Sequence, residues 1–264
     1  MLRRLNIFFI FSVCFVSCDK EINLALDKNA SMLVIEANIT DQPGPYFVKL
    51  TRSVAVTDKN IFPGVTNATI TITDNLGKRD TLIHTIDGVY QTNKLRGISG
   101  LTYYLEVNVD GKKFTAESTM PQKVALDSLR INGFEINGVE RYNVIPGYTD
   151  PIQLGNSYRF IQKINDTLDQ TFHVFNDNLN NGKVNQRPLR IGTDQLEIKL
   201  KDTISVEMQC VTRDTYLYYY TLNQQSSAGP GGGTTPSNPP SNIRGGALGV
   251  FSAHTKQVNV ITIK

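Results

Sequence analysis

Apolar and polar residues alternate along several stretches of this chain, and this pattern constrains the fold more than any other feature. From Ala68 to Thr73, three apolar side chains alternate with three threonines, and residues 101–109 repeat the alternation. A period of two places one kind of side chain on each face of a β-strand. Asp110-Gly111 then supplies the residue pair typical of a two-residue hairpin turn. These stretches predict antiparallel β structure.

The same pattern extends over most of the chain and predicts a mainly β protein in two parts. About seven short strands over 31–121 predict an N-terminal immunoglobulin-like or transthyretin-like sandwich. Residues 122–264 are expected to form a second β-rich domain that carries one Tyr-rich helix. The expected strands, besides those above, are 32–39, 46–54, 112–118, 129–136, 157–164, 171–175, 196–200, 203–211, 247–253 and 257–263.

The helix is predicted over 213–225, with Thr212 or Asp214 as its N-cap. Its tyrosines are spread around the helix axis, so more than one face must be covered. Packing within its own domain is the preferred interpretation, and contact with a partner protein is the alternative. A Gly/Pro-rich loop over 226–246 follows and is expected to form neither helix nor strand. The residues proposed for a partner contact are Tyr216, Tyr218, Tyr219, Tyr220, Pro239 and Pro240.

The N-terminal residues have the pattern of a bacterial lipoprotein signal. Arg3 and Arg4 precede an apolar run over 5–16, which is shorter than the roughly 20 residues that a membrane-spanning helix needs. The run ends at Ser17-Cys18, where the chain becomes polar. This predicts a signal peptide over 1–17, lipidation of Cys18 and a tether over 18–30. The alternative is a plain cleaved signal peptide with an incidental cysteine.

Charge and motifs exclude several classes of function. Loss of residues 1–17 leaves 25 basic against 24 acidic side chains, so a nucleic-acid partner is not expected. The three histidines, His84, His173 and His254, are dispersed and form no catalytic or metal-binding motif. Residues 177–182 begin like a calcium loop, but Leu179 stands where a ligand is needed. We therefore expect no catalytic residues, no cofactor and no metal.

Two further sets of residues have competing interpretations. Cys210 shares the apolar face of its strand, so we expect a buried apolar side chain rather than a reactive thiol. Four Asp-Ser/Thr-apolar triplets are similar to the acceptor for O-glycosylation of exported Bacteroidota proteins, but Asp-Thr can equally open a strand after a turn. The hydroxyl residues concerned are Thr81, Ser128, Thr167 and Thr203.

Several segments together resemble the Bacteroidota lipoprotein family known as domain of unknown function 4249. They are Cys18 with Glu21–Leu24, Leu33–Ile39, Pro43–Leu50, Gly88–Thr92, Gly100–Leu105, Met120-Pro121, Pro239–Ile243 and Gly245–Ala253. The resemblance covers most of the chain after Cys18 and implies no established activity. It implies a partner, because such proteins tend to be encoded beside TonB-dependent outer-membrane receptors. Asp19-Lys20-Glu21 is similar to signals that send such lipoproteins to the cell exterior.

The expected function is therefore that of a surface-exposed outer-membrane lipoprotein. It would be held in the membrane by its lipid and would help a TonB-dependent β-barrel receptor to capture or import a ligand that the sequence does not identify. The alternatives are a structural or assembly scaffold of an envelope complex, or an adhesin. A hydrolase would need a pocket in which a histidine meets both a carboxylate and a hydroxyl.

Overall fold

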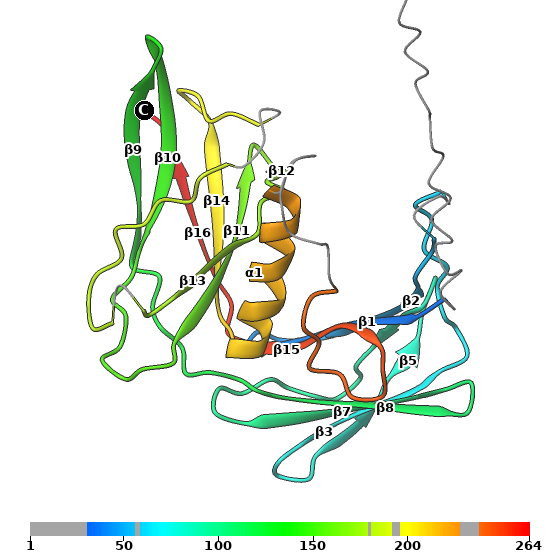
Figure 1. Cartoon of the computed structure of the whole chain (residues 1–264). Helices are drawn as coiled ribbons and strands as arrows, with labels where there is room; N and C mark the ends of the chain where they lie inside the picture. The colour runs from blue at the N-terminus through cyan, green and yellow to red at the C-terminus, as the bar shows by residue number, and fades with distance from the viewer. Residues whose placement is uncertain (1–30, 56–58, 179–180, 192–195, 228–237) are drawn as a thin grey trace, which may run out of the picture. The chain divides into compact units, whose positions relative to one another are not determined.

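Two β-sandwich cores organise the chain, and each forms between two sheets (Figure 1). The computed structural model describes residues 31–55, 59–178, 181–191, 196–227 and 238–264. These residues all belong to one unit, Ser31–Lys264. The predicted signal peptide and tether lie outside the described residues.

The first sandwich is built from a sheet in the order β15-β1-β2-β6-β5 and a sheet in the order β4-β3-β7-β8. Its strands are β1 (Leu33–Thr40), β2 (Phe47–Arg52), β3 (Thr69–Asp74), β4 (Arg79–Thr81), β5 (Ile83–His84), β6 (Val89–Gln91), β7 (Thr102–Val109), β8 (Lys112–Thr119) and β15 (Leu248–His254).

Alternation produces the core of this sandwich, as the sequence predicted. Ile35, Ala37 and Ile39 of β1 all point inward, and every second residue of β7 from Tyr103 to Val109 is buried in the same core. Burial of one such Ile or Leu contributes roughly 1.5–3 kcal/mol, so the period-two pattern also fixes which face of each strand turns inward. The predicted Asp110-Gly111 hairpin is confirmed, with φ of 50° and 70° between β7 and β8.

Strand β15 lies in a different place from the one predicted. The sequence placed residues 247–253 in the second domain, whereas β15 pairs in parallel with β1 and forms the edge of the first sheet. The two backbones approach closely at Gly249, where a Cβ atom would lie 2.1 Å from the Ile35 carbonyl oxygen. The φ of Gly249 is also +100°, a conformation that favours glycine. The chain thus returns to its first sheet near its end.

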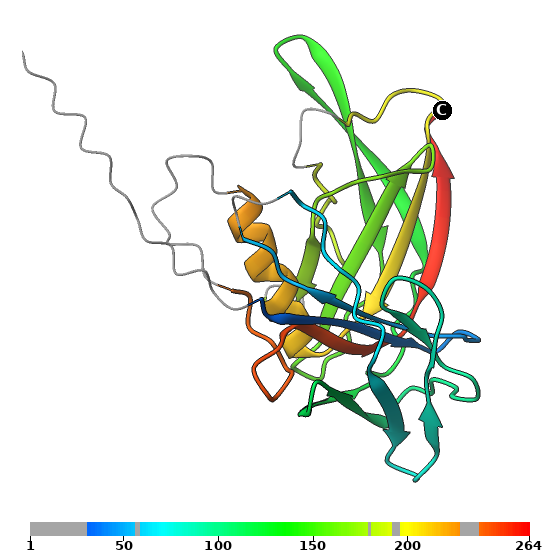
Figure 2. The same ribbon diagram turned by 90° about the vertical axis from the view of Figure 1, so that its right-hand side faces the viewer.

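The second sandwich contains a two-stranded sheet, β10-β9, and a larger sheet in the order β12-β11-β14-β16, with β13 paired to β11. Its elements are β9 (Ser128–Ile136), β10 (Val139–Gly147), β11 (Ser157–Ile164), β12 (Thr167–Leu168), β13 (His173–Asn176), β14 (Thr203–Cys210), α1 (Arg213–Ser227) and β16 (Gln257–Thr262). Tyr158 and Phe160 of β11 and Val206 and Met208 of β14 form part of its core. Figures 1 and 2 show α1 on one side of the larger sheet, and Figure 1 shows the β9–β10 hairpin on the other.

Three sequence predictions for this half need correction. Residues 196–200 form no strand, although Ile198 is buried in the second core. The prediction missed β10, which pairs with β9 through an Asn137-Gly138 turn. The segment 226–246, expected to form neither helix nor strand, contains both helical and strand-like residues in its described part. Its residues 226–227 belong to α1, and Arg244 forms a β-bridge with Thr115 of β8.

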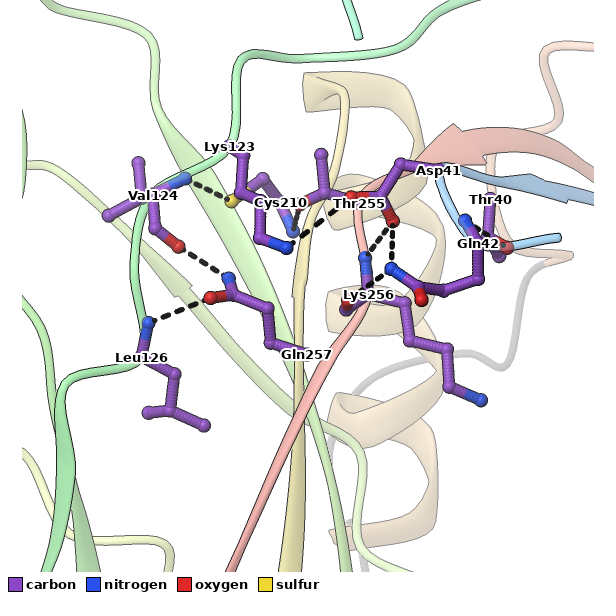
Figure 3. Close-up of polar contacts among 10 residues, drawn as sticks. All are labelled: Thr40, Asp41, Gln42, Lys123, Val124, Leu126, Cys210, Thr255, Lys256 and Gln257. Atoms are coloured by element: carbon purple, nitrogen blue, oxygen red, sulfur yellow. Dashed lines mark hydrogen bonds and ion pairs between the residues drawn. The ribbon is translucent and has the colours of Figure 1, made fainter. Parts of the chain in front are cut away.

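Hydrogen bonds tie the two sandwiches together where β15 ends and β16 begins (Figure 3). Gln257 Nε2 donates to the Val124 carbonyl at 2.6 Å, and its Oε1 accepts from Leu126 N at 3.2 Å, which fixes the linker before β9. Toward the first sandwich, the Lys256 backbone N–H donates at 2.8 Å to Oδ1 of Asp41, the residue that follows β1.

Cys210 belongs to the same junction. Its sulfur accepts a hydrogen bond from Val124 N at 3.4 Å, and its backbone N–H donates to Thr255 Oγ1 at 3.3 Å (Figure 3). The side chain is 2% exposed, and burial raises the pKa of its thiol. The predicted buried, apolar character of Cys210 is confirmed.

Candidate functional site

Helix α1 begins at a polar cap and packs against both sandwiches. The Thr215 backbone N–H donates to Thr212 Oγ1 at 3.3 Å. This bond satisfies one of the free N–H groups of the first helical turn. The helix lies against β11 and β13 of the second sandwich and also contacts β15 of the first. Packing on several sides agrees with the requirement derived from its sequence, and the contact with β15 extends beyond the single domain that was expected.

Tyr219 anchors the helix to the sheet. The guanidinium carbon of Arg159 on β11 lies 3.8 Å from the centre of the Tyr219 ring, and the Phe172 ring packs nearby at 5.7 Å. The first of these is a cation–π contact. Arg159 Nη1 also donates to Gln209 Oε1 on β14 at 3.3 Å. Burial raises the pKa of the Tyr219 hydroxyl, and the positive charge of Arg159 opposes this shift.

The other tyrosines of the predicted partner contact differ in exposure. Tyr216 accepts a hydrogen bond from Asn176 Nδ2 at 3.1 Å and stacks on Tyr220 at 5.6 Å. Tyr218 is half-buried, and burial raises its pKa to about 12. Tyr220 is 42% exposed and is the most exposed tyrosine of this set. In the following segment Pro239 is half-buried and Pro240 is exposed.

A groove of about 420 Å³ runs beside β13, between α1 and the segment 187–190. We call it the arginine groove. Its principal lining residues are Phe172, His173, Phe175, Arg187, Arg190 and Tyr220. Its volume falls within the range of small-molecule sites, which also combine apolar walls with a few convergent polar groups.

Two arginines give the arginine groove its charge. The guanidinium of Arg187 lies over the Phe175 ring, 4.0 Å from its centre. This stacking fixes its position, and a guanidinium stacked on a ring can still form hydrogen bonds in its own plane. Arg190 is exposed. Neither guanidinium forms an ion pair with a carboxylate of the described residues. Among those residues, no aspartate or glutamate lines the groove.

The buried carboxylate of Asp169 contacts His173, which lines the arginine groove, and its oxygens already accept hydrogen bonds. Asp169 Oδ2 lies 2.7 Å from His173 Nε2, and Asp169 Oδ1 accepts a hydrogen bond from Thr171 N at 3.0 Å. Burial raises the pKa of Asp169, but the hydrogen bonds from His173 and Thr171 outweigh this effect and lower it. The Thr171 side chain bonds to Asp169 as well, so this cluster stabilises a carboxylate instead of directing a hydroxyl at His173.

The remaining histidines lie apart from the arginine groove. His254 Nδ1 lies 2.9 Å from Ser252 Oγ, and both side chains are buried. His84 is exposed and packs its ring against Tyr90 at 5.0 Å. Asp177, the first residue of the rejected calcium loop, accepts hydrogen bonds from the backbone N–H groups of Gly155 and Asn156.

A larger hollow of about 500 Å³ lies over β3, β7 and β8. It carries charges of both signs, and several of them are already paired. Glu106 bonds to Lys113 and Asn108, which lowers its pKa, and Arg79 donates to Thr71 at 3.4 Å. Such an internally neutralised surface selects less strongly for a charged ligand than the arginine groove does.

The four predicted glycosylation residues are all exposed and lie at strand ends. Thr81 ends β4, and Ser128, Thr167 and Thr203 begin β9, β12 and β14. Cys18, the predicted lipidation site, lies outside the described residues. Sequence reasoning missed Arg187 and Arg190. Two arginines close together in the sequence with no acid between them were the available signal.

The fold defines the class of this protein. It is mainly β, with two sandwiches in one unit and one α-helix among the described residues. Within those residues, no helix combines the length and the apolar character needed to cross a membrane. Residues 19–259 match the family described as domain of unknown function (DUF4249), and the chain belongs to this family.

Two other comparisons complete these findings. No curated protein matches the chain. Among solved structures, it is similar to a segment of two fibronectin type-III domains from chicken tenascin. The identity is 13%, the match covers 69% of this chain and 92% of the tenascin segment, and the TM-score is 0.22.

Proposed function

We propose that this protein is a Bacteroidota outer-membrane lipoprotein, anchored through Cys18 and facing the cell exterior, that serves a TonB-dependent receptor as an accessory subunit in ligand capture or import. One observation carries the proposal: the apolar N-terminal run ends at Ser17-Cys18, a short distance before the folded unit that begins at Ser31. Membership of the family supports it, since the match begins directly after Cys18.

The length of the tether limits which partners the folded unit can meet. Residues 18–30 span at most about 45 Å even when fully extended. Two or more acyl chains hold a protein stably on a membrane. The two sandwiches would therefore stay near the membrane surface, where an integral membrane protein is the constant neighbour. A β-barrel receptor in the same membrane fits this position.

Exposed apolar side chains of the second sandwich supply a surface for such a partner. Val258 and Val260 point outward from β16, and Val260 is 61% exposed. Neighbouring exposed apolar residues of this kind mark protein contacts more often than scattered ones do. In the proposal, this surface meets the receptor.

The anchor is tested first, with the native protein and a Cys18→Ser variant expressed in the native host. We expect the native protein to partition into the membrane and detergent phase, with a mass that exceeds the polypeptide from Cys18 onward by the attached lipid. The variant should lose both properties. A native protein that is soluble and unmodified would overturn the proposal.

The partner is tested by purification in mild detergent. The native protein should co-purify with a β-barrel receptor, and Val260→Asp should reduce the yield of that receptor. Leu76→Asp is the matched control, because Leu76 is also exposed but lies between β3 and β4 of the first sandwich. Deletion should impair growth on one nutrient. A general envelope defect, or purification without a barrel, would favour the scaffold alternative.

A further inference from the structure

The arginine groove has the chemistry of a binding site for a small organic anion. We propose that it binds a ligand through a carboxylate or phosphate group held by Arg187 and Arg190, with the organic part of the ligand against the aromatic walls. This inference is independent of the lipid anchor and of the identity of any partner protein.

Arg187 and Arg190 give the arginine groove the charge and the hydrogen-bond donors to bind an anion. Guanidinium groups form paired hydrogen bonds with carboxylate and phosphate oxygens, and such charge-assisted bonds are about twice as strong as neutral ones. Arg187 is half-buried, so its charge is less screened by solvent than that of an ordinary surface arginine. No carboxylate of the described residues pairs with Arg187 or Arg190, so an incoming anion displaces no ion pair within this part of the chain.

The position of Arg187 is fixed in two ways. The stack of Arg187 on Phe175 holds the guanidinium in place before a ligand arrives, which reduces the entropy lost on binding. Asn185, just before it in the chain, is fully buried and donates to the Pro146 carbonyl at 2.8 Å, so the segment that carries Arg187 is itself fixed. Arg187 is therefore held both by its ring contact and by the segment that carries it.

The apolar and aromatic lining residues select for the rest of the ligand. The Phe172 ring packs on Tyr219, and Val174 and Pro188 add further apolar surface. Tyr220 contributes an exposed phenol to the same groove. A flat ring joined to an anionic group would place its ring on these surfaces and its charge at the guanidinium groups. Aryl carboxylates and aryl phosphates have this shape.

The test uses the full chain purified in detergent and titrated with benzoate, phenyl phosphate or uncharged benzamide, followed by calorimetry or NMR. We expect saturable binding of at least one of the two anions, weakened by salt, and no saturable binding of benzamide. Binding of benzoate alone or of phenyl phosphate alone would support the proposal and decide which oxyanion the site prefers. Failure of both anions to bind, or equal binding of benzamide, would overturn the proposal.

Variants then locate the site. Arg187→Gln and Arg190→Gln should each weaken anion binding by roughly tenfold. Arg187→Lys should recover only part of the affinity, because it keeps the charge and loses the planar fork. Arg96→Gln is the matched control, since Arg96 is exposed and lies in the first half of the chain. An unchanged affinity in Arg190→Gln, which removes an exposed side chain, or equal losses in Arg96→Gln would refute the assignment.

Discussion

At the scale of single residues, the aspartates of the four Asp-Ser/Thr pairs show how one motif can have two meanings. Asp80 is buried, and its Oδ2 accepts hydrogen bonds from three consecutive backbone N–H groups, those of residues 93–95, at 2.6–2.9 Å. Asp202 likewise accepts from Lys199 N at 2.8 Å and so closes the turn before β14. These aspartates therefore fix turns and loops next to strands, while the neighbouring hydroxyls remain exposed. Glycosylation stays a prediction.

His254 gives a prediction for the dependence of stability on pH. Burial, with the positive charge of Arg159 acting in the same direction, lowers its pKa to about 4 from 6.5. Between these values the unfolded chain binds a proton that the folded chain does not, so the free energy of unfolding falls as the pH falls from 6.5 towards 4. A shift of this size corresponds to about 3 kcal/mol, fully present above pH 6.5.

Chemical denaturation at neutral pH and near pH 4.5 measures this effect. In His254→Gln the loss of stability on acidification should be smaller than in the native protein by most of that amount. His84→Gln is the control, because it makes the same replacement at an exposed histidine of the first sandwich. If the native protein and His254→Gln gave identical pH profiles, His254 would have to be charged or accessible in the folded state.

At the scale of elements, the sequence predicted strands whose two faces differ, missed one strand whose faces do not, and predicted one strand that does not form. Strands β1, β7 and β14 bury one face, and alternation identified them. Strand β10 begins with three exposed residues and later buries pairs of adjacent residues, so its burial pattern has no period of two. Apolar and charged residues alternate over 196–200, and Ile198 is buried in the core, but these residues form no strand. Side-chain burial and strand pairing are separate requirements.

The candidate site was predictable only in part for a related reason. Tyr219 and Tyr220 stood out in the sequence because a Tyr-rich helix is unusual. Arg187 did not, because its significance depends on Phe175 beneath it and on the absence of a described acid from the groove. Contacts between separate segments of this kind cannot be read from local sequence.

Helix α1 offers a comparison between two adjacent tyrosines. Tyr219→Ala removes both the packing on Phe172 and the contact with Arg159. It should lower the free energy of unfolding by about 2–3 kcal/mol. Tyr220→Ala should cost less than about 1 kcal/mol, since Tyr220 is 42% exposed and forms neither of these contacts. Urea denaturation measures both, and equal losses would contradict the packing described for Tyr219.

At the scale of the whole molecule, the chain crosses between its two sandwiches more than once. It leaves the first after β8, returns to it with β15 and leaves again with β16 after only Thr255 and Lys256. The parallel pairing of β1 with β15 joins the beginning of the folded unit to a segment near its end, as in the pair Val34 and Leu248. Neither strand's pattern indicates its partner, and for this reason the sequence divided the chain into two successive domains. Because of this return, unfolding of one sandwich must disturb the other.

Replacement of Gln257 tests the coupling between the two sandwiches. Its amide satisfies two backbone groups of the linker, Val124 C=O and Leu126 N–H, so Gln257→Ala should free the linker and leave both groups without their partner. We expect the thermal transition to broaden or to divide into two, with a loss of roughly 1–3 kcal/mol in the less stable sandwich. Val260→Ala is the control on the same strand, because Val260 points to solvent. Differential scanning calorimetry distinguishes the outcomes. A single transition as sharp in Gln257→Ala as in the native protein would mean that the β15–β16 crossing alone couples the two sandwiches.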